Sequence, residues 1–181
     1  WLWTRELPCV ILGGGSNVLI SDRGIREVVV LNRARRIQFD ASGNMPGVWA
    51  ESGANFGLIA RQAASYGLSG LEWAVGVPGT LGGAVVGNAG AHGSDMAACL
   101  VLAEILHRNS QELVPVELPV AELGYVYRSS LLKQQPGQQV VLSAKLRLEK
   151  SKPLAVQALM DEFTAKRQRT QPPGATMGSR F

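Results

Sequence analysis

The sequence predicts an α+β fold, in which short strands gather in sheets and a few helices pack beside them. Runs rich in β-branched residues recur along the chain, as in Arg26–Leu31 and Gln138–Glu149. Apolar residues follow helical spacing in Asn55–Tyr66 and Pro153–Arg169. Hydrophobic residues make up 46% of the 181 residues and charged residues 18%, a composition that supports a packed core.

Short strands separated by turns are expected in the N-terminal third of the chain. Their predicted ranges are Pro8–Leu12, Val18–Ile20, Arg26–Leu31, Arg36–Phe39 and Val48–Glu51. Turns are predicted over 21–24 and 41–44, where Ser, Asp, Asn and Gly gather. A helix follows from Asn55 to Tyr66, because Asn55 is a suitable N-cap and Gly67 a suitable C-terminal stop.

The C-terminal half is predicted to alternate strands and helices. The expected elements are a helical turn within 79–86, paired strands over Leu100–His107 and Glu112–Val116 with a loop over 109–111, a brief helix over Leu118–Leu123 and a long strand over Gln138–Glu149. An amphipathic helix is then predicted from Pro153 to Arg169. Proline suits its first turn, and its last turn is basic, which complements the helix dipole.

Nine glycines fall between Gly67 and Gly93, more than a packed core requires. Glycine is costly in regular structure, and it suits tight turns or places where a ligand lies against bare main chain. A segment with so little side-chain bulk stabilises itself poorly by packing. A compact Ω-like loop is the alternative, but a ligand-binding wall is the favoured interpretation.

A second glycine run, Gly13–Asn17, follows an apolar segment. Successive backbone N–H groups in a glycine turn form an anion-binding nest, and the side chains of Ser16 and Asn17 add further donors. A pyrophosphate fits this chemistry, and a plain tight connection is an equally good alternative. The spacing differs from the Gly-x-Gly-x-x-Gly fingerprint of Rossmann folds.

Arg128 follows Tyr127 in a short polar segment. Its guanidinium fork matches a carboxylate, although a surface arginine stacked on tyrosine explains the pair taken alone. His92 lies in the glycine-rich segment and His107 in a strand pattern, so no catalytic triad is indicated. No metal-ligand spacing is present in the sequence, and no metal is expected.

A net charge of +4 suits anionic small molecules, and it is too small and scattered to indicate nucleic acid. The cluster Arg33–Arg36 is expected to be a solvated strand edge or turn. Cys9 and Cys99 are expected to be buried free thiols, which indicates a cytoplasmic setting. No signal peptide or membrane-spanning run is visible, no membrane partner is expected, and a monomer is the expected state.

Six segments together resemble the bacterial UDP-N-acetylenolpyruvoylglucosamine reductase (MurB) family. They are Leu12–Leu19 (LGGGSNVL), Gly67–Glu72 (GLSGLE), Gly76–Gly83 (GVPGTLGG), Asn88–Ala91 (NAGA), Tyr127–Ser130 (YRSS) and Gly178–Phe181 (GSRF). Each segment alone is weak, but the ordered set extends over nearly the whole chain and is highly specific.

The resemblance implies a flavoprotein with a vanillyl-alcohol-oxidase-type (PCMH-like) FAD-binding domain, without a Rossmann fold. Its expected substrates are UDP-N-acetylglucosamine enolpyruvate and NADPH, and its product is UDP-N-acetylmuramate, a peptidoglycan precursor. The residues expected to contact FAD are Gly13, Gly14, Gly15, Ser16, Asn17, Gly76, Pro78, Gly79, Thr80, Gly82, Gly83, Asn88, Ala89 and Gly90.

By the same resemblance, Arg128 sits against the substrate carboxylate, Tyr127 supports the substrate or the arginine, and Ser179 acts as general acid. Arg128 and Ser179 are 51 positions apart (179 − 128), a short interval that resembles the family's compact form. Both chain ends look like cuts in a longer protein. A third catalytic group of the family, a late glutamate, is absent, so we expect this chain alone to be inactive or nearly so.

The expected domains are an FAD-binding domain over 1–149, in two α+β subdomains, and the start of a substrate-binding domain over 150–181. Two alternatives stay open at this point. One is another FAD oxidoreductase of the same fold that acts on alcohols or sugars, and the other is a non-catalytic nucleotide-binding fragment.

Overall fold

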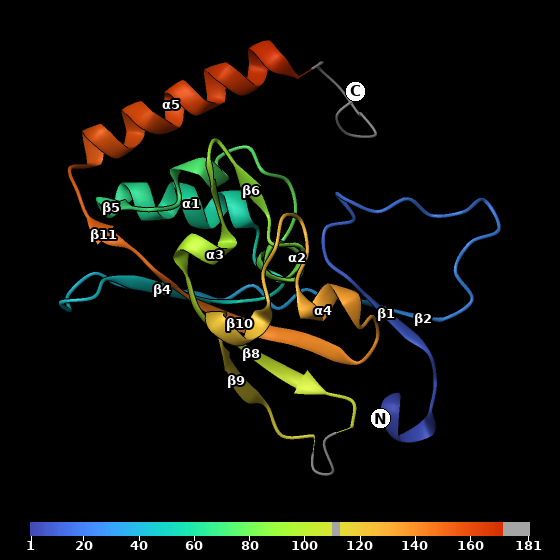
Figure 1. Cartoon of the computed structure of the whole chain (residues 1–181). Helices are drawn as coiled ribbons and strands as arrows, with labels where there is room; N and C mark the ends of the chain where they lie inside the picture. The colour runs from blue at the N-terminus through green and yellow to red at the C-terminus, as the bar shows by residue number, and fades with distance from the viewer. Residues whose placement is uncertain (110–112, 172–181) are drawn as a thin grey trace.

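A five-stranded antiparallel sheet forms the centre of the protein in the computed structural model, which describes residues 1–109 and 113–171 (Figure 1). In order across the sheet its strands are β3 (Ile37–Asp40), β4 (Gly47–Glu51), β10 (Gln139–Arg147), β8 (Leu100–His107) and β9 (Val116–Pro119). The long strand β10 pairs with β8 and β4, so that Ala144 lies opposite both Ala103 and Ala50. These alanines are fully buried and bring the helices close to the sheet.

Helices cover one face of this sheet (Figure 1). They are α1 (Phe56–Ser65), α2 (Leu81–Gly87) and α3 (Met96–Cys99), together with the 3₁₀ turn η2 (Glu72–Ala74). The core between helices and sheet contains large, fully buried side chains such as Phe56, Ile59, Leu81 and Ile105. Helix α5 (Pro153–Thr170) packs outside α1 and η2 and forms a third layer.

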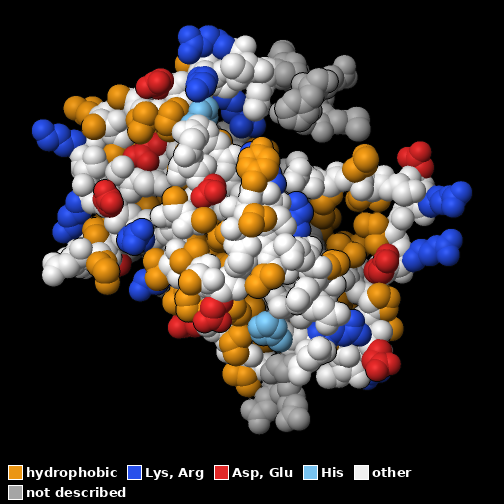
Figure 2. Space-filling model, viewed as in Figure 1, with side chains coloured by type: hydrophobic (Ala, Val, Ile, Leu, Met, Phe, Trp, Pro, Cys, Tyr) orange, Lys and Arg blue, Asp and Glu red, His pale blue; other side chains and the backbone are white. Residues whose placement is uncertain are grey.

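The N-terminal part forms a separate lobe beside the sheet (Figure 1). After the 3₁₀ turn η1 (Trp3–Arg5), strands β1 (Cys9–Leu12) and β2 (Val28–Leu31) pair in parallel, in register from Cys9 and Val28. All four residues of β2 are exposed. Hydrophobic side chains line the hollow between this lobe and the rest of the molecule (Figure 2).

Small elements complete the described chain. Two-residue strands pair as β5 (Leu68–Ser69) with β11 (Glu149–Lys150) and as β6 (Gly90–Ala91) with β7 (Ser94–Asp95). The 3₁₀ turn η3 (Val120–Leu123) and helix α4 (Leu131–Gln134) lie between β9 and β10 in the chain. The side chain of Ser130 caps α4 by accepting a hydrogen bond from the Lys133 N–H.

The predicted helix after Asn55 is confirmed, including both of its ends. The Asn55 Oδ1 accepts a hydrogen bond from the Leu58 N–H at 2.8 Å, and Gly67 has φ +66°. The helix after Pro153 also forms, with proline in its first turn. The predicted amphipathic character is wrong: Val156 and Met160 are its buried residues, whereas Leu154 and Leu159 are exposed, so its apolar residues do not gather on one face.

Three other expected features are wrong. Val18–Ile20 is not a strand, and Leu19 there is 85% exposed. Strand β9 begins only at Val116, where the prediction placed a strand end, and Glu112 and much of the expected loop lie outside the described residues. Cys9 is only half-buried, whereas Cys99 is buried as expected. Local β propensity overestimates strands whose partners the fold does not supply.

Candidate functional site

The two glycine-rich segments meet at Gly13 and Thr80. A Cβ atom added at Gly13 would lie 2.4 Å from the Thr80 Oγ1, and one at Gly14 would lie 3.9 Å from the Gly79 Cα. Any side chain at Gly13 would therefore displace the Thr80 side chain or push the segments apart. The structure brings together two runs of predicted FAD-binding residues that are more than 60 positions apart in the sequence.

Bare main chain faces open space beside this contact. Gly15 and Gly79 have φ of +70° and +109°, and a Cβ atom at either position would meet no heavy atom within 4 Å. Ser16 and Asn17 are exposed. Backbone N–H groups, a hydroxyl and an amide on an open glycine turn form a donor set suited to a pyrophosphate. The residues present thus fit the diphosphate part of FAD.

The second glycine segment is fixed by hydrogen bonds to the loop between β4 and α1. The Phe56 N–H donates to the Gly79 carbonyl at 3.1 Å, and the Gly82 N–H donates to the Ser52 carbonyl at 2.8 Å. A Cβ atom at Gly82 would lie 2.8 Å from the Ser52 Cβ, so this glycine allows α2 to approach the loop. Gly82 thus has a packing role here, whereas Pro78 and Gly83 are exposed.

Asn88 is the most heavily bonded of the predicted FAD-binding residues. It is 4% exposed and adopts φ +42°, a left-handed conformation that asparagine tolerates. Its Nδ2 donates to the Asp95 Oδ2 at 3.2 Å and to the Val126 carbonyl at 3.1 Å. Its Oδ1 accepts from the Ala97 N–H at 3.1 Å. Asn88 therefore joins three separate segments by its side chain.

The segment that carries Tyr127 and Arg128 is a tight turn. Val126 and Ser129 exchange backbone hydrogen bonds at 3.1 Å, and Arg128 adopts φ +58°. Its guanidinium lies 5.5 Å from the centre of the Tyr127 ring, and the Lys133 Nζ donates to its carbonyl at 2.8 Å. Tyr127 is 87% exposed, so its ring is available to a ligand.

This turn is held against the end of helix α2. The Tyr125 hydroxyl donates to the Val85 carbonyl at 2.8 Å, and the Ser130 hydroxyl donates to the Val86 carbonyl at 2.6 Å. These bonds satisfy carbonyls in the last turn of the helix, which lack partners within it. Burial raises the pKa of Tyr125 well above its ordinary value, with smaller contributions from Cys99 and Asp95, so its hydroxyl stays a hydrogen-bond donor.

Sequence reasoning missed several residues that hold this site. Asp95 supports Asn88, and Ser52 receives the Asn32 amide at 2.8 Å while it packs against Gly82. Nothing in the sequence indicated a partner for His92, whose ring stacks on Phe163 with ring centres 4.3 Å apart. None of these residues belongs to a local motif. Ser179 lies outside the described residues.

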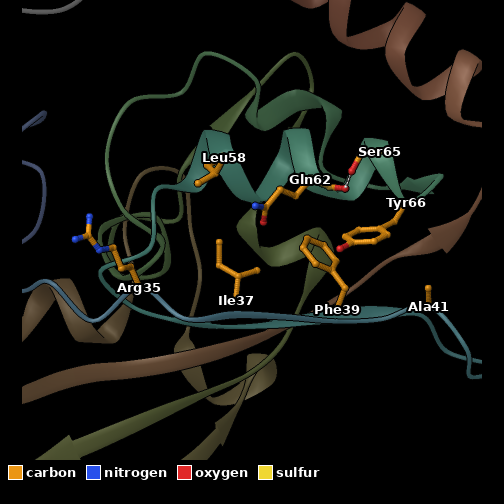
Figure 3. Close-up of a pocket in the computed structure, with 8 residues that line it drawn as sticks. All are labelled: Arg35, Ile37, Phe39, Ala41, Leu58, Gln62, Ser65 and Tyr66. Carbon is orange, nitrogen blue, oxygen red and sulfur yellow. Dashed lines mark hydrogen bonds between the residues drawn. The ribbon is translucent and has the colours of Figure 1, made fainter.

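Strand β3 and helix α1 border a further groove of about 650 Å³ (Figure 3). Its walls include Arg35 at one end and the ring pair of Phe39 and Tyr66 toward the other. None of the predicted site residues lines it. Within 1–109 and 113–171, no group of three or more His, Cys, Asp or Glu could hold a metal ion. In the same ranges, no helix is both long and apolar enough to cross a membrane.

The family described as the FAD binding domain matches residues 1–111, more than half of the chain. This range contains Gly13–Asn17, Gly76–Gly83 and Asn88–Gly90. Every residue proposed from the sequence to contact FAD therefore falls within the matched family region.

Curated relatives match over nearly the whole chain. The UDP-N-acetylenolpyruvoylglucosamine reductase of Chloroflexus aggregans is 40% identical over 185 aligned positions, which cover 100% of this chain and 61% of the relative. The protein of the same name from Gloeobacter violaceus is 43% identical, covering 96% of this chain and 57% of the relative. The chain spans about three fifths of the length of the relatives it matches.

Solved structures also match this chain. The MurB reductase from Thermus caldophilus matches with a TM-score of 0.77 and 32% identity, over 93% of this chain and 58% of that protein. Cholesterol oxidase from B. sterolicum matches with a TM-score of 0.60 and 12% identity, over 83% of this chain and 31% of that protein, a likeness of fold alone. The α+β, vanillyl-alcohol-oxidase-type fold is thus confirmed. The chain belongs to the FAD-binding domain family and corresponds to part of the UDP-N-acetylenolpyruvoylglucosamine reductases.

Proposed function

We propose that this chain is the FAD-binding part of an enzyme that reduces UDP-N-acetylglucosamine enolpyruvate to UDP-N-acetylmuramate, with NADPH as reductant, in peptidoglycan precursor synthesis. The observation that carries the proposal is the side chain of Asn88. It ties the glycine-rich wall to the turn of Tyr127 and Arg128 through the Val126 carbonyl at 3.1 Å. This hydrogen bond connects the proposed cofactor wall with the turn that carries the proposed carboxylate-binding arginine.

The residues of the first glycine loop would hold the diphosphate. Gly15 and Gly79 leave main chain open to a ligand, and Ser16 and Asn17 add donors on the exposed side. Hydride transfer is the chemistry that a bound flavin supplies. The role of the chain is to bind, orient and shield the reacting partners.

Arg128 would bind and orient the enolpyruvyl carboxylate. A planar guanidinium engages a carboxylate by two parallel hydrogen bonds, and its charge stabilises negative charge that develops during reduction. The Arg128 guanidinium lies 5.5 Å from the centre of the Tyr127 ring, and the Arg128 carbonyl accepts a hydrogen bond from the Lys133 Nζ at 2.8 Å. Ser179 would donate the proton to the α-carbon, and Arg128 and Ser179 are the catalytic residues proposed for this chain.

The likeness to cholesterol oxidase does not favour an alcohol substrate, because at 12% identity it concerns the fold alone. The segments Tyr127–Ser130 and Gly178–Phe181 are not requirements of that fold. The other alternative, a nucleotide-binding fragment without turnover, is distinguished from a flavoprotein by the FAD-binding test that follows.

The test is to add FAD to the purified chain and to record flavin absorbance and fluorescence. We expect stoichiometric FAD binding but no oxidation of NADPH that depends on the enolpyruvyl sugar. Bound UDP without bound FAD would contradict the flavoprotein proposal. Turnover at the rate of an intact reductase would contradict the proposal that the chain is only part of the catalytic unit.

Arg128 is tested separately by Arg128→Gln, with Arg61→Gln, at an exposed arginine of helix α1, as a matched control outside this turn. In a protein that carries the rest of the substrate site, Arg128→Gln should lower kcat at least ~100-fold, the range seen when one charge-stabilising donor is lost. FAD affinity should stay unchanged. Equal activity of the wild-type protein and Arg128→Gln would refute the role of this residue.

A further inference from the structure

His92 lies at the tip of the β6–β7 hairpin, and its imidazole ring stacks on Phe163 of α5. The ring centres are 4.3 Å apart and the planes differ by 8°. His92 has φ +52°, and Gly93 after it has φ +84°. A non-glycine residue in the left-handed region is strained, and such residues persist where their surroundings hold them. His92 is held in the turn of the hairpin, and its ring also packs on α5.

The hairpin transmits its position to Asn88. Gly90 pairs with Asp95, and the Asp95 Oδ2 accepts a hydrogen bond from the Asn88 Nδ2 at 3.2 Å. The Met96 N–H donates to the Ala89 carbonyl at 2.9 Å. Because Asp95 of β7 and Met96, the residue that follows it, are both bonded to 88–89, we expect a shift of the hairpin tip to move the Asn88 side chain.

Asn88 in turn contacts the turn that presents Arg128. Its Nδ2 also donates to the Val126 carbonyl at 3.1 Å, and Val126 is the first residue of that turn. Asn88, His92 and Arg128 all have positive φ. Contacts thus connect the Phe163 ring on α5, through His92 and Asn88, with Val126 in the turn that carries Arg128.

Helix α5 contacts the β6–β7 hairpin through its C-terminal half. Its two buried residues, Val156 and Met160, anchor the first half to the core. Beyond them, Phe163 contacts His92, and the Arg167 side chain lies 3.0 Å from the position of a Cβ atom at Gly76. The second half of α5 therefore contacts the glycine-rich segment at two places, Gly76 and His92.

We propose that His92 is a positioning residue, whose stack on Phe163 lets the docking of α5 set the position of the Tyr127–Arg128 turn. The proposal rests on the proposed function only for the role of Arg128. The proposed coupling between α5 and the turn is argued from the contacts of His92 and Asn88 and does not depend on the proposed function.

The test uses hydrogen exchange of the whole chain without cofactor, for peptides that cover 88–97 and 124–130. His92→Asn removes the ring but tolerates the left-handed backbone, whereas His92→Tyr keeps an aromatic ring. Phe163→Leu and Phe163→Tyr form the matching pair on α5. Loss of either ring should speed exchange about three- to tenfold in both segments, the range that an aromatic pair contributes.

The tyrosine variants should exchange like the wild-type chain, and the double variant His92→Asn/Phe163→Leu should exchange no faster than either single one. Unchanged exchange in 124–130, or failure of His92→Tyr to restore it, would overturn the proposal. So would an equal acceleration in β10, because the ring would then affect only general stability. FAD titration of the wild-type chain tests the proposed function independently.

Discussion

Gly13 is the residue at which a single methyl group should have the largest effect on the candidate site. In Gly13→Ala the new Cβ atom would lie 2.4 Å from the Thr80 Oγ1, so the Thr80 side chain must shift or the two glycine-rich segments must separate. We expect FAD affinity to fall at least ~10-fold, because the cofactor would have to restore the contact on binding. Flavin fluorescence titration measures the loss.

Two further variants control this experiment. Thr80→Ala in the Gly13→Ala background removes the clashing hydroxyl and should restore part of the affinity. Gly43→Ala adds the same methyl group in the turn between β3 and β4. There the new Cβ atom would lie 3.7 Å from the Asp40 carboxylate, an ordinary van der Waals distance, and FAD affinity should not change. Full affinity in Gly13→Ala would show that the segments do not act together.

His92 gives the stack on α5 a pH dependence. Burial, followed by the charges of Lys166 and Arg167, lowers the pKa of His92 below 6.5, and Glu162 acts in the opposite direction. The unfolded chain therefore binds a proton more readily than the folded chain. The contribution of His92 to stability is therefore present above about pH 6.5 and is lost as the pH falls below that value through the lower pKa of the folded chain.

The melting temperature should accordingly decrease more between pH 7.5 and 5.5 for the wild-type chain than for His92→Tyr, which keeps the stack without titrating in that range. His107, the second histidine, provides the control, since His107→Gln should leave this difference in place. An identical pH dependence of wild type and His92→Tyr would contradict the assignment.

At the scale of single elements, helix α1 should depend on its cap. The Asn55 Oδ1 accepts the Leu58 N–H at 2.8 Å, and Asn55 also forms a backbone bridge with Thr80. Asn55→Ala should cost about 1 kcal/mol of unfolding free energy and lower Tm by about 2–4 °C. Asn55→Ser keeps an acceptor and should stay close to wild type. Equal melting of all three chains would exclude a stabilising cap.

Elements with local signals were predictable from the sequence, and elements that depend on partners were not. Asn55 and Gly67 specify both ends of α1 within a few residues, so the helix could be read directly. Val18–Ile20 has the composition of a strand but finds no pairing among the described residues, because pairing is decided by distant chain. Helix α5 has helical signals throughout, yet burial of only Val156 and Met160 could not be read from its pattern.

The same division applies to the candidate site. The glycine runs could be proposed from the sequence because bare main chain has recognisable chemistry, whereas a role for Arg128 came only from the family resemblance. The contact between Gly13 and Thr80, and the bonds of Asn88 to Asp95 and Val126, join segments far apart in sequence. These links arise from the tertiary fold, and no single motif encodes them.

At the scale of the whole molecule, the two-stranded β1–β2 sheet is packed much less than the central five-stranded sheet. The residues of β2 are between 36% and 47% exposed, and β2 pairs only with β1 among the described strands. Strand β10, by contrast, has a partner on each side and a buried face. Isolated two-stranded sheets are marginal in water, so the N-terminal lobe should open independently of the core.

Hydrogen exchange should therefore be at least ~100-fold faster for the amides of 28–31 than for the central amides of β10. FAD should narrow this gap, because a ligand on the loop between β1 and β2 stabilises only the closed lobe. At 100 times Kd the stabilisation is about 2.7 kcal/mol, which corresponds to ~100-fold slower opening-limited exchange. Equal protection of both sheets without FAD would mean that the lobe is already coupled to the core. Protection of β10 but not of 28–31 on adding FAD would place the ligand away from the glycine loop.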